Sequence, residues 1–137
     1  MTKIKSRQDF HNKRQQSWAC TRCGWNMQTK FQHCPECDST LIAYFASKAE
    51  LKRWAELRLG VRGKIFDELR LQPEFPIAIN GVHICVYRAD FSYVDLEKKK
   101  IVVEDVKGAK DEKYHDPVFK LKRKMVEAAY GIKITLV

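Results

Sequence analysis

Two aspartates and a lysine in the second half of the chain have the residue types and spacing of a metal-dependent hydrolytic site. Asp90 and Asp105 lie in β-rich segments joined by a charged connection, and Lys107 follows two residues after Asp105. A turn centred between residues 97 and 98 places Asp90 opposite Asp105, with β-carbons about 5 Å apart. Lys107 then shares a face with Asp105, because side chains alternate along a strand.

Carboxylates this close repel each other unless a cation lies between them. Their hard oxygen atoms suit magnesium or manganese. Such a metal activates water and neutralises charge on a phosphoryl oxygen, while a lysine orients the water or stabilises the developing charge. The alternative is a surface hairpin with ordinary cross-strand ion pairs. Val102 and Val106 flank Asp105 on the other face, which favours a strand covered on both faces.

Four of the five cysteines form two C-x-x-C pairs separated by ten residues: Cys20, Cys23, Cys34 and Cys37. Each pair presents two sulfurs on one tight turn, and four thiolates form the tetrahedral site that zinc prefers. We expect a structural zinc, because a site filled by four thiolates has no open position for substrate. His33 is an alternative ligand beside the second pair. An odd cysteine count without a secretion signal disfavours a disulfide framework.

Composition limits the class of protein. Lys and Arg number 26 against 17 Asp and Glu, for a net charge of +9, which suits a polyanion such as nucleic acid or serves solubility alone. No apolar run approaches the roughly 20 residues of a membrane-spanning helix. The N-terminus is basic and polar, unlike a secretory signal. We therefore expect a cytoplasmic protein without membrane contact.

The elements that must position these residues fall into three parts. We expect a basic flexible tail over residues 1–17, a zinc ribbon over 18–41 and a periodic part over 42–137. A capping box at Ser47 predicts a helix to about Leu59. The remaining expected elements are a short helical piece at 62–70, strands at 75–79, 82–94 and 100–107, a helix at 116–130 and a strand at 132–136.

The expected turns and caps come from particular residue types. Asn80-Gly81 predicts a turn, Asp116 an N-cap and Gly131 a helix stop. In the last helix we expect a buried stripe of Val118, Leu121, Met125 and Ala128. The resulting order of helices and strands in the periodic part is α-β-β-β-α-β.

These features resemble the PD-(D/E)XK nuclease superfamily. Asp90 fits its first acidic position, and Asp105-Val106-Lys107 fits its (D/E)-x-K. The resemblance implies an α+β fold, with a restriction-endonuclease-like α-β-β-β-α-β core and a mixed sheet, preceded here by a small zinc ribbon. The match is closer to a short, largely phage-encoded family with a resolvase-like core. This resemblance covers roughly residues 43–137. The segments similar to that family's sequence pattern are 45–50, 71–73, 89–91, 103–108, 121–124 and 130–132.

The resemblance implies metal-dependent hydrolysis of DNA phosphodiesters. Asp90 and Asp105 would hold Mg²⁺ or Mn²⁺ with the backbone carbonyl of Val106, and Lys107 would act on the attacking water. Glu50 matches a helix glutamate that often completes the site in resolvase-like members. The alternative for Glu50 is structural, because it is also the third residue after Ser47 in the capping box.

Basic side chains supply candidate DNA contacts. They lie in the last helix (Lys120, Lys122, Arg123 and Lys124), in the hairpin connection (Lys98, Lys99 and Lys100) and in the ribbon (Arg22). Trp18 and Trp25 either stack on bases or pack the ribbon's small core.

Together these observations predict a Mg²⁺-dependent DNA endonuclease, with branched DNA such as a Holliday junction as a candidate substrate. We expect a homodimer and no small-molecule cofactor. The alternative is a DNA-binding adaptor or regulator that has a zinc ribbon and an inactive nuclease core.

Overall fold

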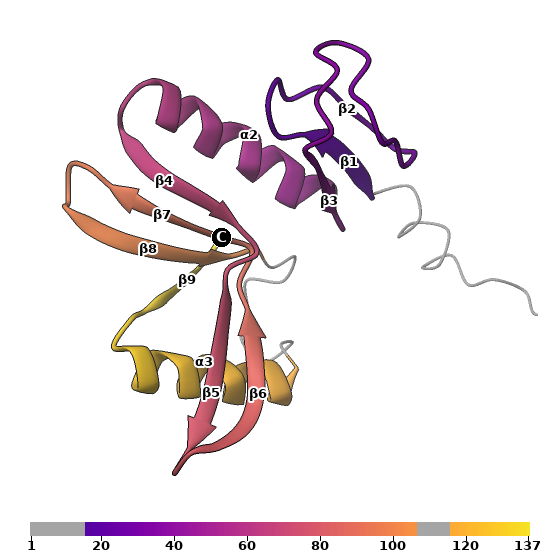
Figure 1. Ribbon diagram of the computed structural model, residues 1–137. Helices are drawn as coiled ribbons and strands as arrows, with labels where there is room; N and C mark the ends of the chain where they lie inside the picture. Colours follow the sequence, from indigo (N-terminus) through magenta and orange to yellow (C-terminus); the bar gives the residue numbers. More distant parts are fainter. Residues whose placement is uncertain (1–15, 107–115) are drawn as a thin grey trace, which may run out of the picture. The chain divides into compact units, whose positions relative to one another are not determined.

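The computed structural model describes residues 16–106 and 116–137 (Figure 1). The chain divides into two compact units, the first ending at Ala55 and the second beginning at Glu56. In the described ranges, neither helix has the length and apolar character needed to cross a membrane.

The first unit contains a three-stranded antiparallel sheet, which we call the cysteine module (residues 17–45). Strand β1 (Ser17–Cys20) lies between β2 (Asn26–Met27) and β3 (Ile42–Phe45). The sequence predicted that the zinc ribbon ends at residue 41, but β3 pairs along the whole of β1. The predicted boundary between residues 41 and 42 therefore falls inside this sheet. Phe45 and Trp54 are both buried, with ring centroids 5.1 Å apart.

Helix α2 (Lys48–Arg62) spans the division between the two units. It runs past Gly60, where the sequence predicted its end. A Cβ atom at Gly60 would lie 2.3 Å from the ring of Phe66, so this glycine permits close approach of that ring.

A four-stranded mixed sheet forms the centre of the second unit. Its strand order is β4 (Phe66–Leu71), β7 (Phe91–Asp95), β8 (Lys100–Asp105) and β9 (Ile134–Leu136). Only β8 and β9 are parallel, and α3 (Pro117–Tyr130) lies between them in the chain, as a parallel pair requires. The α+β class with a mixed sheet is therefore confirmed.

Two of the predicted elements are wrong. Residues 66–71 form β4 and not part of a helix, because pairing with β7 overrides their local helical preference. The predicted strand 82–94 is two strands, since β6 (Val82–Arg88) pairs with β5 (Glu74–Ile79) while β7 joins the larger sheet. Hairpin β5–β6 is thus inserted between β4 and β7, and without it the order α2, β4, β7, β8, α3, β9 reads α-β-β-β-α-β.

Both predicted ends of α3 are confirmed. The Asp116 carboxylate accepts a hydrogen bond from the Val118 N–H at 2.8 Å, and Gly131 ends the helix with a φ of 65°. The predicted buried stripe is wrong for three of its residues, because Val118 and Leu121 are each 58% exposed and Ala128 is exposed. The fourth, Met125, is partly buried against the core of the second unit. Val126 is the fully buried residue of this helix.

The face that α3 buries is set by hairpin β5–β6, against which the helix packs (Figure 1). Phe119 lies beside Tyr87, with ring centroids 6.2 Å apart, and the Tyr130 hydroxyl donates to the Pro76 carbonyl at 2.6 Å. The core of the second unit joins this hairpin to the sheet through six buried residues: Ile77, Tyr87, Ala89, Val103, Val126 and Ile134.

Candidate functional site

The β7–β8 hairpin has the register that the sequence predicted. Its pairs run from Asp95↔Lys100 to Phe91↔Glu104, symmetric about residues 97 and 98. Asp90 lies one residue beyond this ladder, and its N–H donates to the Glu104 carbonyl at 3.1 Å. One oxygen of the Asp90 carboxylate, Oδ2, accepts from the Val106 N–H at 2.7 Å. Asp90 is therefore attached to the end of β8 that carries the second acid.

Asp105 is a buried carboxylate with a specific donor. Its side chain is 4% exposed, and Oδ2 accepts a hydrogen bond from the Tyr87 hydroxyl. Burial, together with the hydrogen bond and charge of Asp105, raises the pKa of Tyr87 well above its ordinary value, so the phenol stays a neutral donor. Such burial argues against the alternative of an ordinary surface ion pair at Asp105.

Both acids line one pocket of about 430 Å³ in the second unit. Its polar lining comes from Tyr87, Arg88, Asp90, Asp105, Asp116 and Lys122. Arg88 forms an ion pair with Glu74 at 2.7 Å, so its charge is already balanced. The pocket thus combines carboxylate oxygens from the β6–β7 junction and from the end of β8 with an ammonium group from α3. Such a set is suited to a divalent cation and an anionic substrate.

Gln72 fixes the backbone at the first acid. It has a positive φ of 49°, and its N–H donates to the Asp90 carbonyl at 2.9 Å. The next residue, Pro73, accepts from the Ala89 N–H at 3.1 Å. The segment 71–73 therefore positions Asp90 from the junction of β4 and β5, a role that the sequence alone did not reveal.

Tyr87 is a site residue that sequence reasoning missed. Its only signals were its place three residues before Asp90 and its alternation with Cys85 on the inner face of β6. A second tyrosine–carboxylate pair joins Tyr93 on β7 to Glu104, the residue before Asp105 on β8. Glu104 is 2% exposed and accepts from the Tyr93 hydroxyl at 2.6 Å, but neither residue lines the pocket.

The other two predicted catalytic residues, Lys107 and Glu50, have different outcomes. Lys107 lies outside the described residues. Glu50 belongs to the first unit, where its backbone N–H donates to Ser47 Oγ at 3.2 Å and its carboxylate accepts from the Ala46 N–H at 3.3 Å. The bond to Ser47 is that of a capping box, as the structural alternative predicted, while the carboxylate bonds to the residue before the cap. A role for Glu50 in the acidic site stays a prediction.

The predicted DNA contacts on α3 differ in whether they line the acidic pocket. Lys122 lines the pocket, whereas Lys120 and Lys124 do not. Arg123 is 19% exposed, forms an ion pair with Glu127 at 2.9 Å and donates to the Ile134 carbonyl at 3.2 Å, which gives it a structural role.

The lysines of the hairpin connection are distant from the acids. Lys98, Lys99 and Lys100 are exposed at the turn of the β7–β8 hairpin. Five paired residues separate this turn from the acidic end, a length of roughly 17 Å. In the cysteine module, Arg22 is exposed.

The four paired cysteines meet as predicted. Their sulfur atoms all lie within 4.8 Å of one another, with Cys20 and Cys37 3.6 Å apart and Cys23 and Cys34 3.5 Å apart. Four thiolates about 2.3 Å from one zinc ion lie about 3.8 Å apart in a tetrahedron, so the cluster fits such a metal. Burial acts to raise the pKa of Cys20, but hydrogen bonds from the Cys23 and Arg22 backbones and from the Cys37 and Cys23 side chains together lower the pKa to about 6.

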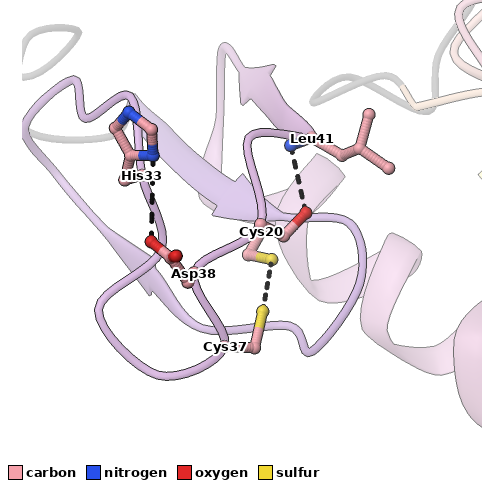
Figure 2. A network of polar contacts seen from close by, with 6 residues as sticks. Cys20, His33, Cys37, Asp38 and Leu41 are labelled. Atoms are coloured by element: carbon pink, nitrogen blue, oxygen red, sulfur yellow. Dashed lines mark hydrogen bonds and ion pairs between the residues drawn. The ribbon is translucent and has the colours of Figure 1, made fainter.

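Residues around the cluster have separate partners. Figure 2 shows the Cys20 and Cys37 sulfurs facing each other, while His33 faces Asp38 at 3.8 Å with 67% of its side chain exposed. His33 is thus not among the clustered ligands. Trp18 is partly buried against Tyr44, with ring centroids 5.2 Å apart, and Trp25 packs edge-on against Phe31 at 5.1 Å. These contacts favour the packing role of the two tryptophans.

Comparison with known proteins gives a family without an assigned activity. No curated protein and no solved structure matches the chain. The family model described as "Protein of unknown function (DUF1064)" matches residues 40–137, which contain both acids and α3 but not the four-cysteine cluster. Because this match covers more than half of the chain, the protein belongs to the DUF1064 family.

Proposed function

We propose that this protein is a Mg²⁺- or Mn²⁺-dependent endonuclease that hydrolyses DNA phosphodiesters on a restriction-endonuclease-like core. The observation that carries the proposal is the shared pocket of Asp90, Asp105 and Lys122 at the open end of the β7–β8 hairpin. Support also comes from the α-β-β-β-α-β order around the inserted hairpin and from the resemblance to PD-(D/E)XK nucleases at both acids.

Each side chain has a defined part in this chemistry. Asp90 and Asp105 would hold the cation through carboxylate oxygens, with the Val106 backbone beside them. When bound, the metal neutralises charge on the phosphoryl oxygen and lowers the pKa of a coordinated water. Lys122 binds a phosphate oxygen. The attacking water loses a proton to solvent as its oxygen bonds to phosphorus. One bond from phosphorus to a sugar oxygen breaks, and that oxygen takes up a proton from solvent.

The rest of the chain supports a DNA substrate. The net charge of +9 favours binding to a polyanion. The four cysteines form a structural zinc ribbon that stabilises the N-terminal part and binds DNA or a partner, with Arg22 exposed on it. Lys107 orients the attacking water, and a homodimer brings two pockets to branched DNA such as a Holliday junction.

A cleavage assay tests this proposal. Purified protein is incubated with a four-way junction, a flap, a single strand and a linear duplex, with and without Mg²⁺ or Mn²⁺. We expect metal-dependent cleavage that Asp105→Ala abolishes and that Glu97→Ala, an acid at the hairpin turn, retains.

The pattern across substrates separates the candidate functions. Cleavage restricted to the junction supports the resolvase-like form, and cleavage of every substrate supports a general nuclease. Tight DNA binding without cleavage under either metal would favour the adaptor with an inactive nuclease core. Undiminished cleavage by purified Asp105→Ala would reject the assigned site.

A further inference from the structure

We propose that Tyr87 is a positioning residue that orients the Asp105 carboxylate for metal binding. This inference rests on the proposed function and deepens it, because it assigns part of the metal affinity to hairpin β5–β6. That hairpin lies outside the four-stranded sheet, whose strand β8 carries Asp105.

The position of the Tyr87 hydroxyl is set by packing. The residue is 3% exposed, and its backbone pairs with Phe75 across the hairpin. Its ring centroid lies 6.4 Å from that of Phe75 and 6.2 Å from that of Phe119 on α3. Aromatic neighbours on two elements restrict the ring, so the hydroxyl is presented to Asp105 in one place.

The two acids are oriented by different donors. Oδ2 of Asp90 accepts from the Val106 N–H, and Oδ2 of Asp105 accepts from Tyr87. A donor on one oxygen of a carboxylate sets the direction of the other oxygen, which is what a cation between two acids requires. Removing such a partner of a metal ligand typically weakens metal affinity by about 10- to 100-fold.

Tyr93, on strand β7, provides a matched control. Its buried hydroxyl donates to Glu104, the residue before Asp105, at 2.6 Å. Tyr93→Phe therefore removes a similar buried hydroxyl from a similar carboxylate, but away from the pocket. A difference between Tyr87→Phe and Tyr93→Phe reports orientation of Asp105 and not general loss of a buried hydrogen bond.

The experiment is a Mn²⁺ titration of the full chain followed by electron paramagnetic resonance, with the protein loaded with zinc beforehand and free zinc removed, because free Zn²⁺ competes with Mn²⁺. We expect Tyr87→Phe to raise the Mn²⁺ Kd by about 10- to 100-fold, Tyr93→Phe to leave it within about twofold, and Asp105→Ala to abolish this binding. We also expect saturating Mn²⁺ to restore DNA cleavage by Tyr87→Phe, which a variant with a damaged fold would not show.

The outcomes separate the two claims. If Asp105→Ala loses Mn²⁺ binding but Tyr87→Phe binds like the wild type, the positioning role is rejected and the metal site stands. An equal loss of affinity in Tyr87→Phe and Tyr93→Phe also rejects the positioning role. If the wild type and Asp105→Ala bind Mn²⁺ alike, the proposed metal site fails, and the role of Tyr87 fails with it.

Discussion

Asp105 places a carboxylate where water has little access, and its surroundings explain how the protein tolerates this. A buried carboxylate is costly unless it is hydrogen-bonded and paired with a positive charge. Tyr87 supplies one such hydrogen bond, and Asp90 lies at the same end of β8. In the proposed function, a divalent cation bound by both acids would add positive charge beside them.

The proposed contact between Lys122 and a phosphate oxygen can be tested by substitution. It lines the acidic pocket, whereas Lys124 is exposed on the same helix and does not. Loss of one charged hydrogen bond is worth about 1.5–3 kcal/mol, so Lys122→Ala should lower kcat/KM for DNA cleavage by about 10- to 100-fold. Steady-state kinetics should show Lys124→Ala within about threefold of wild type, and equal effects of the two variants would contradict the assignment.

Elements with local signals could be predicted from the sequence. Helix α3 has an aspartate cap and a glycine stop, and the β7–β8 register follows from the position of one turn. Strand β4 could not be predicted, because its six residues have helical character and are extended only through pairing with β7. The break at Ala89-Asp90 contains no proline or glycine and arises because β6 and β7 have different partners.

The contact between α2 and β4 can be tested at Gly60. A methyl group there would overlap the Phe66 ring, whereas at Gly63 its nearest neighbour is 3.4 Å away. Gly60→Ala should lower the free energy of unfolding by about 1–3 kcal/mol through overpacking. Gly63→Ala should leave it unchanged or raise it by up to about 1 kcal/mol. Urea denaturation measures both, and a stabilised Gly60→Ala would contradict the packing described here.

The packing of α3 against β9 can be tested at Arg123. Its guanidinium contacts Glu127 and the Ile134 carbonyl. Arg123→Ala should destabilise the fold by about 1–3 kcal/mol in urea denaturation, since both acceptors lose a charged partner. Lys124→Ala should change stability by less than about 0.5 kcal/mol. A fully stable Arg123→Ala that only weakens DNA binding would instead support the sequence-based assignment of Arg123 as a DNA contact.

At the scale of the whole molecule, the two candidate metal sites lie in different units. The four cysteines are in the first unit, and Asp90, Asp105 and Lys122 are in the second. The cysteine cluster could be predicted from spacing alone, because C-x-x-C turns are local. That Tyr87 and Lys122 line the acidic pocket could not be predicted, because it depends on how an inserted hairpin and a helix pack together.

Removal of metal should therefore affect the units unequally. A small module whose core is a metal cluster loses its folding free energy without the metal. A zinc chelator should abolish hydrogen-exchange protection in β1 and β3, while β7 and β8 stay protected. Exchange measured by mass spectrometry checks this, and Cys34→Ser should reproduce the chelator's effect. Retained protection in β1 after complete zinc removal would contradict a structural zinc.

Anomalous X-ray scattering from crystals grown with Mn²⁺ locates the ion and so decides whether Asp90 and Asp105 hold it. We expect a peak bonded to carboxylate oxygens of both Asp90 and Asp105, at the roughly 2.0–2.6 Å typical of oxygen ligands to such ions. The peak should vanish in Asp105→Ala. A Mn²⁺ ion bound elsewhere in an enzyme that cleaves DNA, or an acid pair that stays empty at saturating Mn²⁺, would contradict this assignment.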